Sequence, residues 1–235
     1  MMKKSMTTLG ATVLMLFAAT SVGASTASAH DTEAPKGKGA GKTVTLTATL
    51  TELNGSGTSG HVTAIVRNKM IKNIEVHAEG LTPDAPHAQH IHFGDQAQHE
   101  CPTLLAQDLN DDGRLSTVEG LPSYGPVAVS LTTTGDTSPA SILAVDRFPV
   151  SEDGMYHYNR SNIKFTDVAG AGPTGGVGTA KEVAAAIRAG EGVVVIHGLD
   201  YDESGAYSFG EKGASELDSA LPAEATDPAA CGVLR

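Results

Sequence analysis

The sequence has few aromatic and few basic residues. Tryptophan is absent, and aromatic residues make up only 4% of the 235 residues, so a core has to be built mainly from Val, Ile, Leu and Ala. Lys and Arg number 16 against 27 Asp and Glu, which gives a formal net charge of −11. This charge disfavours nucleic acids and anionic membrane surfaces as partners, and it favours cations, calcium included.

The sequence also lacks an apolar run of the roughly eighteen residues that a membrane-spanning helix needs. Its apolar stretch near the N-terminus, Leu9 through Ala19, is shorter and follows Lys3 and Lys4. The small residues 27–29 (Ala-Ser-Ala) then match the pattern that signal peptidase cleaves. We therefore expect residues 1–29 to be a signal peptide and the protein to be secreted, with no membrane segment after cleavage.

Cysteine is nearly absent, with only Cys101 and Cys231. In an oxidising compartment, two cysteines most simply form one disulfide. Closing a loop of roughly 130 residues contributes about 4–5 kcal/mol in the chain-entropy model. We expect these two residues to be bonded.

After a polar, glycine-rich stretch at 30–42, expected to be a flexible leader, an alternating pattern begins. Residues 43–53 (TVTLTATLTEL) alternate apolar side chains with threonines, as a half-buried strand does. Further strands are expected at 60–67, 72–81, 88–93, 126–133, 141–147, 156–165, 192–197 and 229–234.

One helix is expected at 180–189 (AKEVAAAIRA), ended by Gly190, and residues 166–180 are expected to form a loop. Many short strands with Gly/Pro-rich connections predict a single all-β domain over residues 43–235. The expected fold is a Greek-key β-sandwich or barrel with one short helix and long loops.

Histidines are concentrated in residues 87–101 (HAQHIHFGDQAQHEC), which hold four of the nine in the chain. Strand alternation sends His90 and His92 to one face and Ile91 to the other. Two imidazoles on one face can bind one metal ion, and copper and zinc favour imidazole nitrogen. His197, at the end of the apolar strand GVVVIH, supplies a third candidate ligand.

Three motifs occur in one order: HIHFGD with a cysteine nine residues after its second histidine, then VVVIHGLDYD, then ACGVL near the end. This combination resembles the copper/zinc superoxide dismutase family. The resemblance implies the Greek-key fold of that family, a Cys101–Cys231 disulfide, and copper held by His90, His92 and His197.

The chain departs from that family at its second metal. Between Cys101 and His197 the only histidine is His157, so the zinc-binding histidines have no counterparts and no zinc is expected. His87 and His99 are local substitutes for the missing copper ligand. Pro228 stands where the family has an arginine that attracts superoxide.

The segments HAQHIHFG, YGPVAVSL and AAIRAGEGVVVIHG are also similar to the secreted chordin-type repeat domain, whose members have no established redox chemistry. Two functions therefore stay open. One is a secreted metal-binding protein, stabilised by calcium and binding copper, and the other is a divergent copper superoxide dismutase without zinc.

The calcium expectation comes from residues 108–119 (DLNDDGRLSTVE), which follow the twelve-residue calcium-loop template. The expected ligands are the side chains of Asp108, Asn110, Asp112 and Glu119 and the backbone carbonyl of Arg114. Flanking helices are not evident, so an isolated loop is expected. The alternative is a surface turn rich in Asp and Asn.

A second stretch, residues 200–211 (DYDESGAYSFGE), follows the template less closely. It offers Asp200, Asp202, Ser204 and Glu211 at the same offsets. It is a weaker calcium candidate, because a serine occupies the fifth position.

Overall fold

The computed structural model describes residues 42–167 and 176–235. The expected signal peptide at 1–29 lies outside the described residues, as does the leader apart from Lys42, together with the middle of the 166–180 loop. No helix in the described ranges has both the length and the apolar character needed to cross a membrane.

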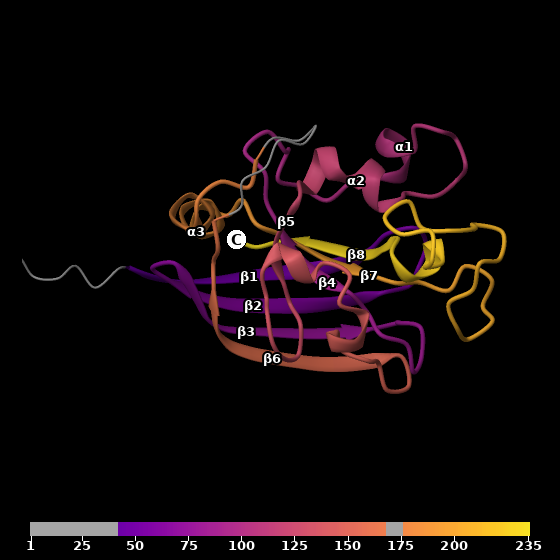
Figure 1. Ribbon diagram of the computed structural model, residues 1–235, viewed down its shortest axis with the longest axis horizontal. Coiled ribbons are helices and arrows are strands. Elements are labelled where there is room, and N and C mark those ends of the chain that lie inside the picture. Colours follow the sequence, from indigo (N-terminus) through magenta and orange to yellow (C-terminus); the bar gives the residue numbers. More distant parts are fainter. Residues whose placement is uncertain (1–41, 168–175) are drawn as a thin grey trace, which may run out of the picture. The chain divides into compact units, whose positions relative to one another are not determined.

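Eight strands form one antiparallel sheet that curls strongly into a half-barrel (Figure 1). The strands are β1 (Thr43–Glu52), β2 (Ser59–Arg67), β3 (Met70–Glu79), β4 (Gln89–His92), β5 (Val127–Ser130), β6 (Met155–Lys164), β7 (Val193–His197) and β8 (Pro228–Val233). Their order across the sheet is β5-β4-β7-β8-β1-β2-β3-β6. The prediction of a predominantly β domain is confirmed.

The sheet has a half of long strands and a half of short ones, which meet at β1. The long strands β1, β2, β3 and β6 alternate buried and exposed residues, so one of their faces is exposed to solvent. The short strands β4, β5, β7 and β8 are buried on both faces. β1 joins the halves, because Thr43 to Leu50 pair with β2 whereas Thr51 and Glu52 pair with β8.

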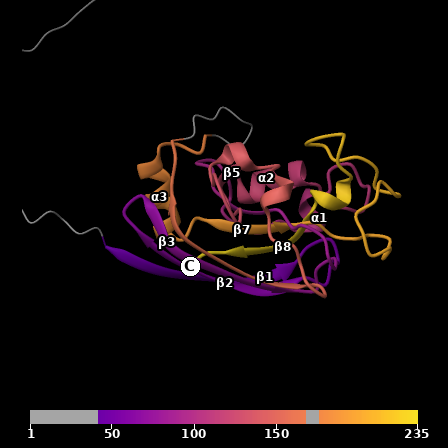
Figure 2. The same cartoon turned by 60° about the horizontal axis from the view of Figure 1, so that its bottom comes forward.

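Two apolar clusters cover the two faces of the short strands. The main core contains Val194 and Ile196 of β7 together with side chains from the long strands. The smaller cluster contains Val193 and Val195, packed against Tyr124 of α2 (Thr117–Tyr124). Figure 2 accordingly shows α2 on the side of β7 and β8 that faces away from β1, β2 and β3.

The predicted helix is confirmed as α3 (Ala180–Ala189). The Thr179 hydroxyl accepts a hydrogen bond from the Glu182 amide and Glu182 caps in return, while Gly190 ends the helix in the left-handed region at φ 92°. Val183 and Ile187 bury the apolar side of the helix in the main core.

The strand predicted at 141–147 is wrong. The segment instead contains two short 3₁₀ turns, η1 (Pro139–Ser141) and η2 (Val145–Arg147). Local polar bonds replace a strand ladder here: the Asp136 carboxylate accepts from the hydroxyl groups of Ser138 and Ser141 at 2.7 Å. The Arg147 guanidinium donates to the Asp136 carbonyl.

The loop at 108–119 has helical neighbours, which the sequence did not predict. A single turn, α1 (Leu104–Gln107), precedes it, and α2 begins within its last residues. Ser116 and Glu119 form a reciprocal capping box that starts α2.

Candidate metal centre

Three histidines share the face of the sheet that α2 covers. Ile91 of β4 lies in the main core, so the alternation of the strand places His90 and His92 on the opposite face. In β7, His197 follows Val195 on that same face. The pairing shifts register beside His92 in β4–β5 and beside His197 in β7–β8, and such bulges re-aim side chains.

The three imidazoles converge. Their ring centroids lie 5.7 Å apart for His90 and His92, 5.2 Å for His90 and His197, and 5.9 Å for His92 and His197. One ligand nitrogen from each ring lies within 4.8 Å of the other two. None of the three side chains is more than 3% exposed.

Backbone carbonyls fix the tautomer of two of these rings. His92 Nδ1 lies 2.8 Å from the Gly125 carbonyl oxygen, and His197 Nδ1 lies 2.7 Å from that of Thr226. A carbonyl oxygen can only accept, so each Nδ1 carries the proton and each neutral ring keeps its lone pair on Nε2. Metal-binding histidines are commonly oriented in this way.

Burial keeps these rings neutral. Desolvation and repulsion from His197 lower the pKa of His92 to about 3, and desolvation lowers the pKa of His197 to about 4. Desolvation and the two neighbouring rings also bring the pKa of His90 well below its ordinary value. All three imidazoles are therefore neutral at neutral pH, and each has a nitrogen lone pair with which it can act as a ligand.

Within residues 42–167 and 176–235, four nitrogens of the triad have no hydrogen-bond partner. Both nitrogens of His90 and the Nε2 atoms of His92 and His197 are buried without a hydrogen bond. An unsatisfied buried polar group costs about 1–3 kcal/mol, so four such atoms in one place call for an explanation. A metal ion bonded to one nitrogen of each ring would satisfy three of them.

The rings line a cavity of about 20 Å³, which Thr117, Thr226 and other side chains also line. This is close to the space that one water-sized particle occupies. The cavity therefore fits a single ion, and the neutral nitrogen donors fit copper or zinc rather than a hard cation such as calcium or magnesium.

The two local substitutes suggested by the sequence do not join this group. His87 is buried behind it, with Nδ1 3.1 Å from the His197 carbonyl and Nε2 3.1 Å from the Thr82 carbonyl. His99 Nε2 lies 2.7 Å from the Gly94 carbonyl. Both rings contact backbone carbonyls of neighbouring segments and are not part of the triad.

The loop 108–119 has the backbone turns of the calcium template without a tight carboxylate cluster. Asp108 accepts hydrogen bonds from the Asp112 and Gly113 amides, and Glu119 accepts from the Leu109 and Ser116 amides. Among the described residues, the acidic and histidine groups that converge within 4.8 Å do not include this loop.

Arg114 contributes more than a backbone carbonyl. Its guanidinium binds Asp112 at 3.1 Å and the buried Asp227 at 2.6 Å. Asp227 also accepts a hydrogen bond from the Tyr201 hydroxyl, so the two acidic loops meet at this carboxylate. The residue before it, Thr226, is the one whose carbonyl orients His197.

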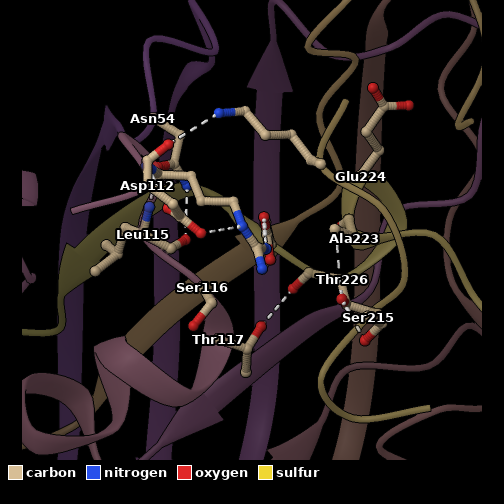
Figure 3. Close-up of polar contacts among 12 residues, drawn as sticks. Asn54, Asp112, Leu115, Ser116, Thr117, Ser215, Ala223, Glu224 and Thr226 are labelled. Atoms are coloured by element: carbon tan, nitrogen blue, oxygen red, sulfur yellow. Dashed lines mark hydrogen bonds and ion pairs between the residues drawn. The ribbon is translucent and has the colours of Figure 1, made fainter. Parts of the chain in front are cut away.

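Figure 3 shows the contacts between the first acidic loop and Thr226, the residue whose carbonyl orients His197. Thr117, the first residue of α2, donates its hydroxyl to the Thr226 carbonyl, and Ser215 bonds the Thr226 hydroxyl. Asn54 also fixes the loop, because its side chain both donates a hydrogen bond to the Leu115 carbonyl and accepts one from the Leu115 amide.

In the second acidic loop, the third carboxylate comes from elsewhere in the chain. The carboxylates of Asp200, Asp202 and Glu224 lie within 4.8 Å of one another, and Glu211 is not part of that group. Glu224 is 2% exposed and accepts hydrogen bonds from the Tyr201 and Ser208 amides. Ser204 donates its amide to both aspartates.

The predicted disulfide is confirmed: Cys101 is bonded to Cys231 in β8. Val195 of β7 pairs directly with Cys231. The bond thus ties the segment after β4 to the strand beside the one that carries His197.

Comparison of the sequence with models of known protein families and with curated proteins finds no match. Function therefore has to be inferred from the geometry of the chain's own residues.

Proposed function

We propose that this protein is a secreted metal-binding β protein that holds one copper ion through His90, His92 and His197. The observation that carries this proposal is the set of buried, unpartnered imidazole nitrogens around a cavity of one-ion size. Such ligands bind Cu²⁺ more tightly than Zn²⁺. A bound copper ion would supply a redox-active cation. The chain's own contribution is to hold the rings neutral, oriented and away from water.

We also infer an architecture of the superoxide-dismutase type, related to that of the chordin-type domains. The strongly curled antiparallel sheet, the strand with two histidines beside β7 and the disulfide to β8 support this inference. Secretion is part of the same proposal, and the disulfide supports it because such bonds persist in oxidising compartments.

Calcium in the loop 108–119 is the second part of the proposal. The match to the twelve-residue template and the helical turns on both sides support it. In the loop 200–211, the convergence of Asp200, Asp202 and the buried Glu224 supports a calcium site that uses Glu224 in place of Glu211.

A zinc-less copper superoxide dismutase is the alternative, supported by the order of the three motifs. Three observations favour a metal-binding protein over an enzyme that dismutates superoxide. The triad is closed off from solvent, the chain carries a net charge of −11, and Pro228 replaces the attracting arginine. The guanidinium of Arg114 offers little to an anion, because two carboxylates already engage it.

Calorimetric titration of the chelator-treated protein with Cu(II) tests the copper site. Wild type should bind one more equivalent than His92→Ala, whereas His99→Ala, which removes a nearby histidine outside the triad, should lose none. Electron paramagnetic resonance of the extra equivalent should show nitrogen ligands. Equal stoichiometry in wild type and His92→Ala would contradict the proposal.

A further inference from the structure

A second group of histidines lies on the long strands, far from the triad in the strand order. His61 of β2 pairs with His77 of β3, and His77 pairs with His157 of β6. We call these three residues the histidine row. Val76 and Tyr158, their neighbours along the chain, are buried, so the row is on the opposite, solvent-facing side of the sheet.

The rings of the row stack across the strands. The centroids of His61 and His77 are 4.6 Å apart at an interplanar angle of 13°, and those of His77 and His157 are 4.0 Å apart at 17°. Stacking holds the imidazoles close together. Because the nitrogen lone pairs lie in the ring planes, His77 and His157 have to turn out of the stack to bind one ion together.

A carboxylate completes the group. Glu75 lies two residues before His77 and therefore on the same face of β3. Its Oε1 accepts hydrogen bonds from the side-chain amides of Asn73 at 3.2 Å and Asn159 at 2.9 Å, which orient the carboxylate. One ligand atom each from Glu75, His77 and His157 lies within 4.8 Å of the others.

The surroundings favour a cation. The row lines an open hollow of about 670 Å³, and the same hollow is lined by Glu79, Glu152 and Asp153. Concave surfaces with charges of one sign concentrate counter-ions. Cross-strand aromatic pairs by themselves stabilise a sheet only weakly, and they do not account for a carboxylate beside the same two rings.

We propose that the outer face of β3 and β6 binds one divalent late transition-metal ion, Zn²⁺ or Cu²⁺, through His77, His157 and Glu75. His61 packs on His77 and serves as a positioning residue. Two imidazoles and one carboxylate suit these ions, whereas calcium and magnesium require sites made of oxygen atoms. The proposal does not depend on the copper triad, which uses different, buried residues.

Calorimetric titration with Zn²⁺ as the probe, on the full chelator-treated chain, tests the site. In a His92→Ala background, which removes the triad, one equivalent should still bind. Replacing both His77 and His157 with alanine should abolish that equivalent, and Glu75→Gln should weaken its affinity by about tenfold or more. His61→Ala should weaken the affinity less than Glu75→Gln does.

Thr49→Ala is the matched control, because Thr49 is the exposed β1 residue that pairs with His61 and carries no imidazole. It should leave Zn²⁺ binding unchanged. In the wild-type background, replacing both His77 and His157 with alanine should remove one equivalent of Zn²⁺. The equivalent that the triad binds should remain. This comparison does not use His92→Ala, so it does not depend on whether that variant folds. Zn²⁺ binding that the double variant leaves unchanged would contradict the proposed site on β3 and β6, without bearing on the triad.

Discussion

At the scale of single residues, His90 of the triad differs from a nearby buried histidine in its hydrogen-bond partners. His90 is buried with both ring nitrogens unpartnered, whereas His87, only three residues earlier, has a carbonyl oxygen near each of its ring nitrogens. The two rings are similarly buried but have opposite polar environments. His87 stabilises the backbone, whereas the ring nitrogens of His90 have no hydrogen-bond partner in the described part of the chain.

This contrast gives the first prediction, made for the metal-free protein. His90→Leu should leave the free energy of unfolding unchanged or raise it by up to about 2 kcal/mol, because an unsatisfied polar group is removed. His87→Leu, the matched control, should lower it by about 1–3 kcal/mol, since the buried carbonyl to which the neutral ring donates loses its donor. Urea denaturation followed by circular dichroism measures both, and a large loss in His90→Leu would show that His90 has a structural role.

At the scale of elements, sequence patterns predicted those parts whose cause is local. The alternation in β1 and the capping residues of α3 lie within a few positions of what they control. Helix α2 could not be predicted, since Gly120 and Pro122 are poor helix formers. A Cβ at Gly120 would lie 2.4 Å from the ring of Tyr124, so tertiary packing decides this helix.

The candidate sites also include residues that local sequence patterns identify and residues that only tertiary contacts bring together. His90, His92 and His197 could be found because a strand pattern and a motif order mark them. Glu224 and Asp227 could not, because contacts between distant segments bring them to the acidic loops. The histidine row was missed for a related reason: its members are 16 and 80 residues apart, and only the register of β2, β3 and β6 aligns them.

The loop 108–119 provides the second prediction. Millimolar calcium should raise the melting temperature of chelator-treated protein by mass action. Glu119 also caps α2, so Glu119→Ala would confound two effects. Glu119→Gln keeps one side-chain oxygen that can accept the capping hydrogen bond from the Ser116 amide, while it gives up the bond from the Leu109 amide and the charge that calcium needs.

The variant Glu119→Gln should therefore melt near wild type without calcium and lose the part of the calcium-induced increase that the loop 108–119 supplies. Glu211→Gln serves as the control in the second acidic loop, where it should change little because Glu224 supplies the third carboxylate. A wild-type melting temperature that does not respond to calcium would indicate an ordinary Asp/Asn-rich turn.

At the scale of the whole molecule, one covalent bond connects regions that are remote in sequence. The Cys101–Cys231 disulfide spans 130 residues and ties the segment after β4 to β8. Cys231 is fully buried in the smaller cluster beside Val195, on the face that carries the triad.

The third prediction concerns the variant in which both cysteines are replaced with alanine. The free energy of unfolding should fall by about 4–5 kcal/mol in the chain-entropy model for a loop of this length. Urea denaturation of oxidised wild type and of the double variant measures the difference. A loss below about 1 kcal/mol would mean that the unfolded chain is hardly constrained by the bond.

Catalysis supplies the fourth prediction. Copper-loaded protein should dismutate superoxide at a rate at least about a hundredfold below the diffusional limit, which is on the order of 10⁹ M⁻¹s⁻¹. The triad is closed to solvent and the net charge of −11 repels an anion. Pulse radiolysis measures this rate directly, and turnover near the limit would favour the enzyme over the binding protein.

The central claim is that the triad is a metal site, and locating an ion tests it most directly. Anomalous diffraction at the copper edge, from crystals of copper-loaded protein, gives the position of the ion without reference to activity. One strong peak should lie about 2 Å from Nε2 of His92, Nε2 of His197 and one nitrogen of His90. Copper-loaded crystals with no peak among these three rings would contradict the account.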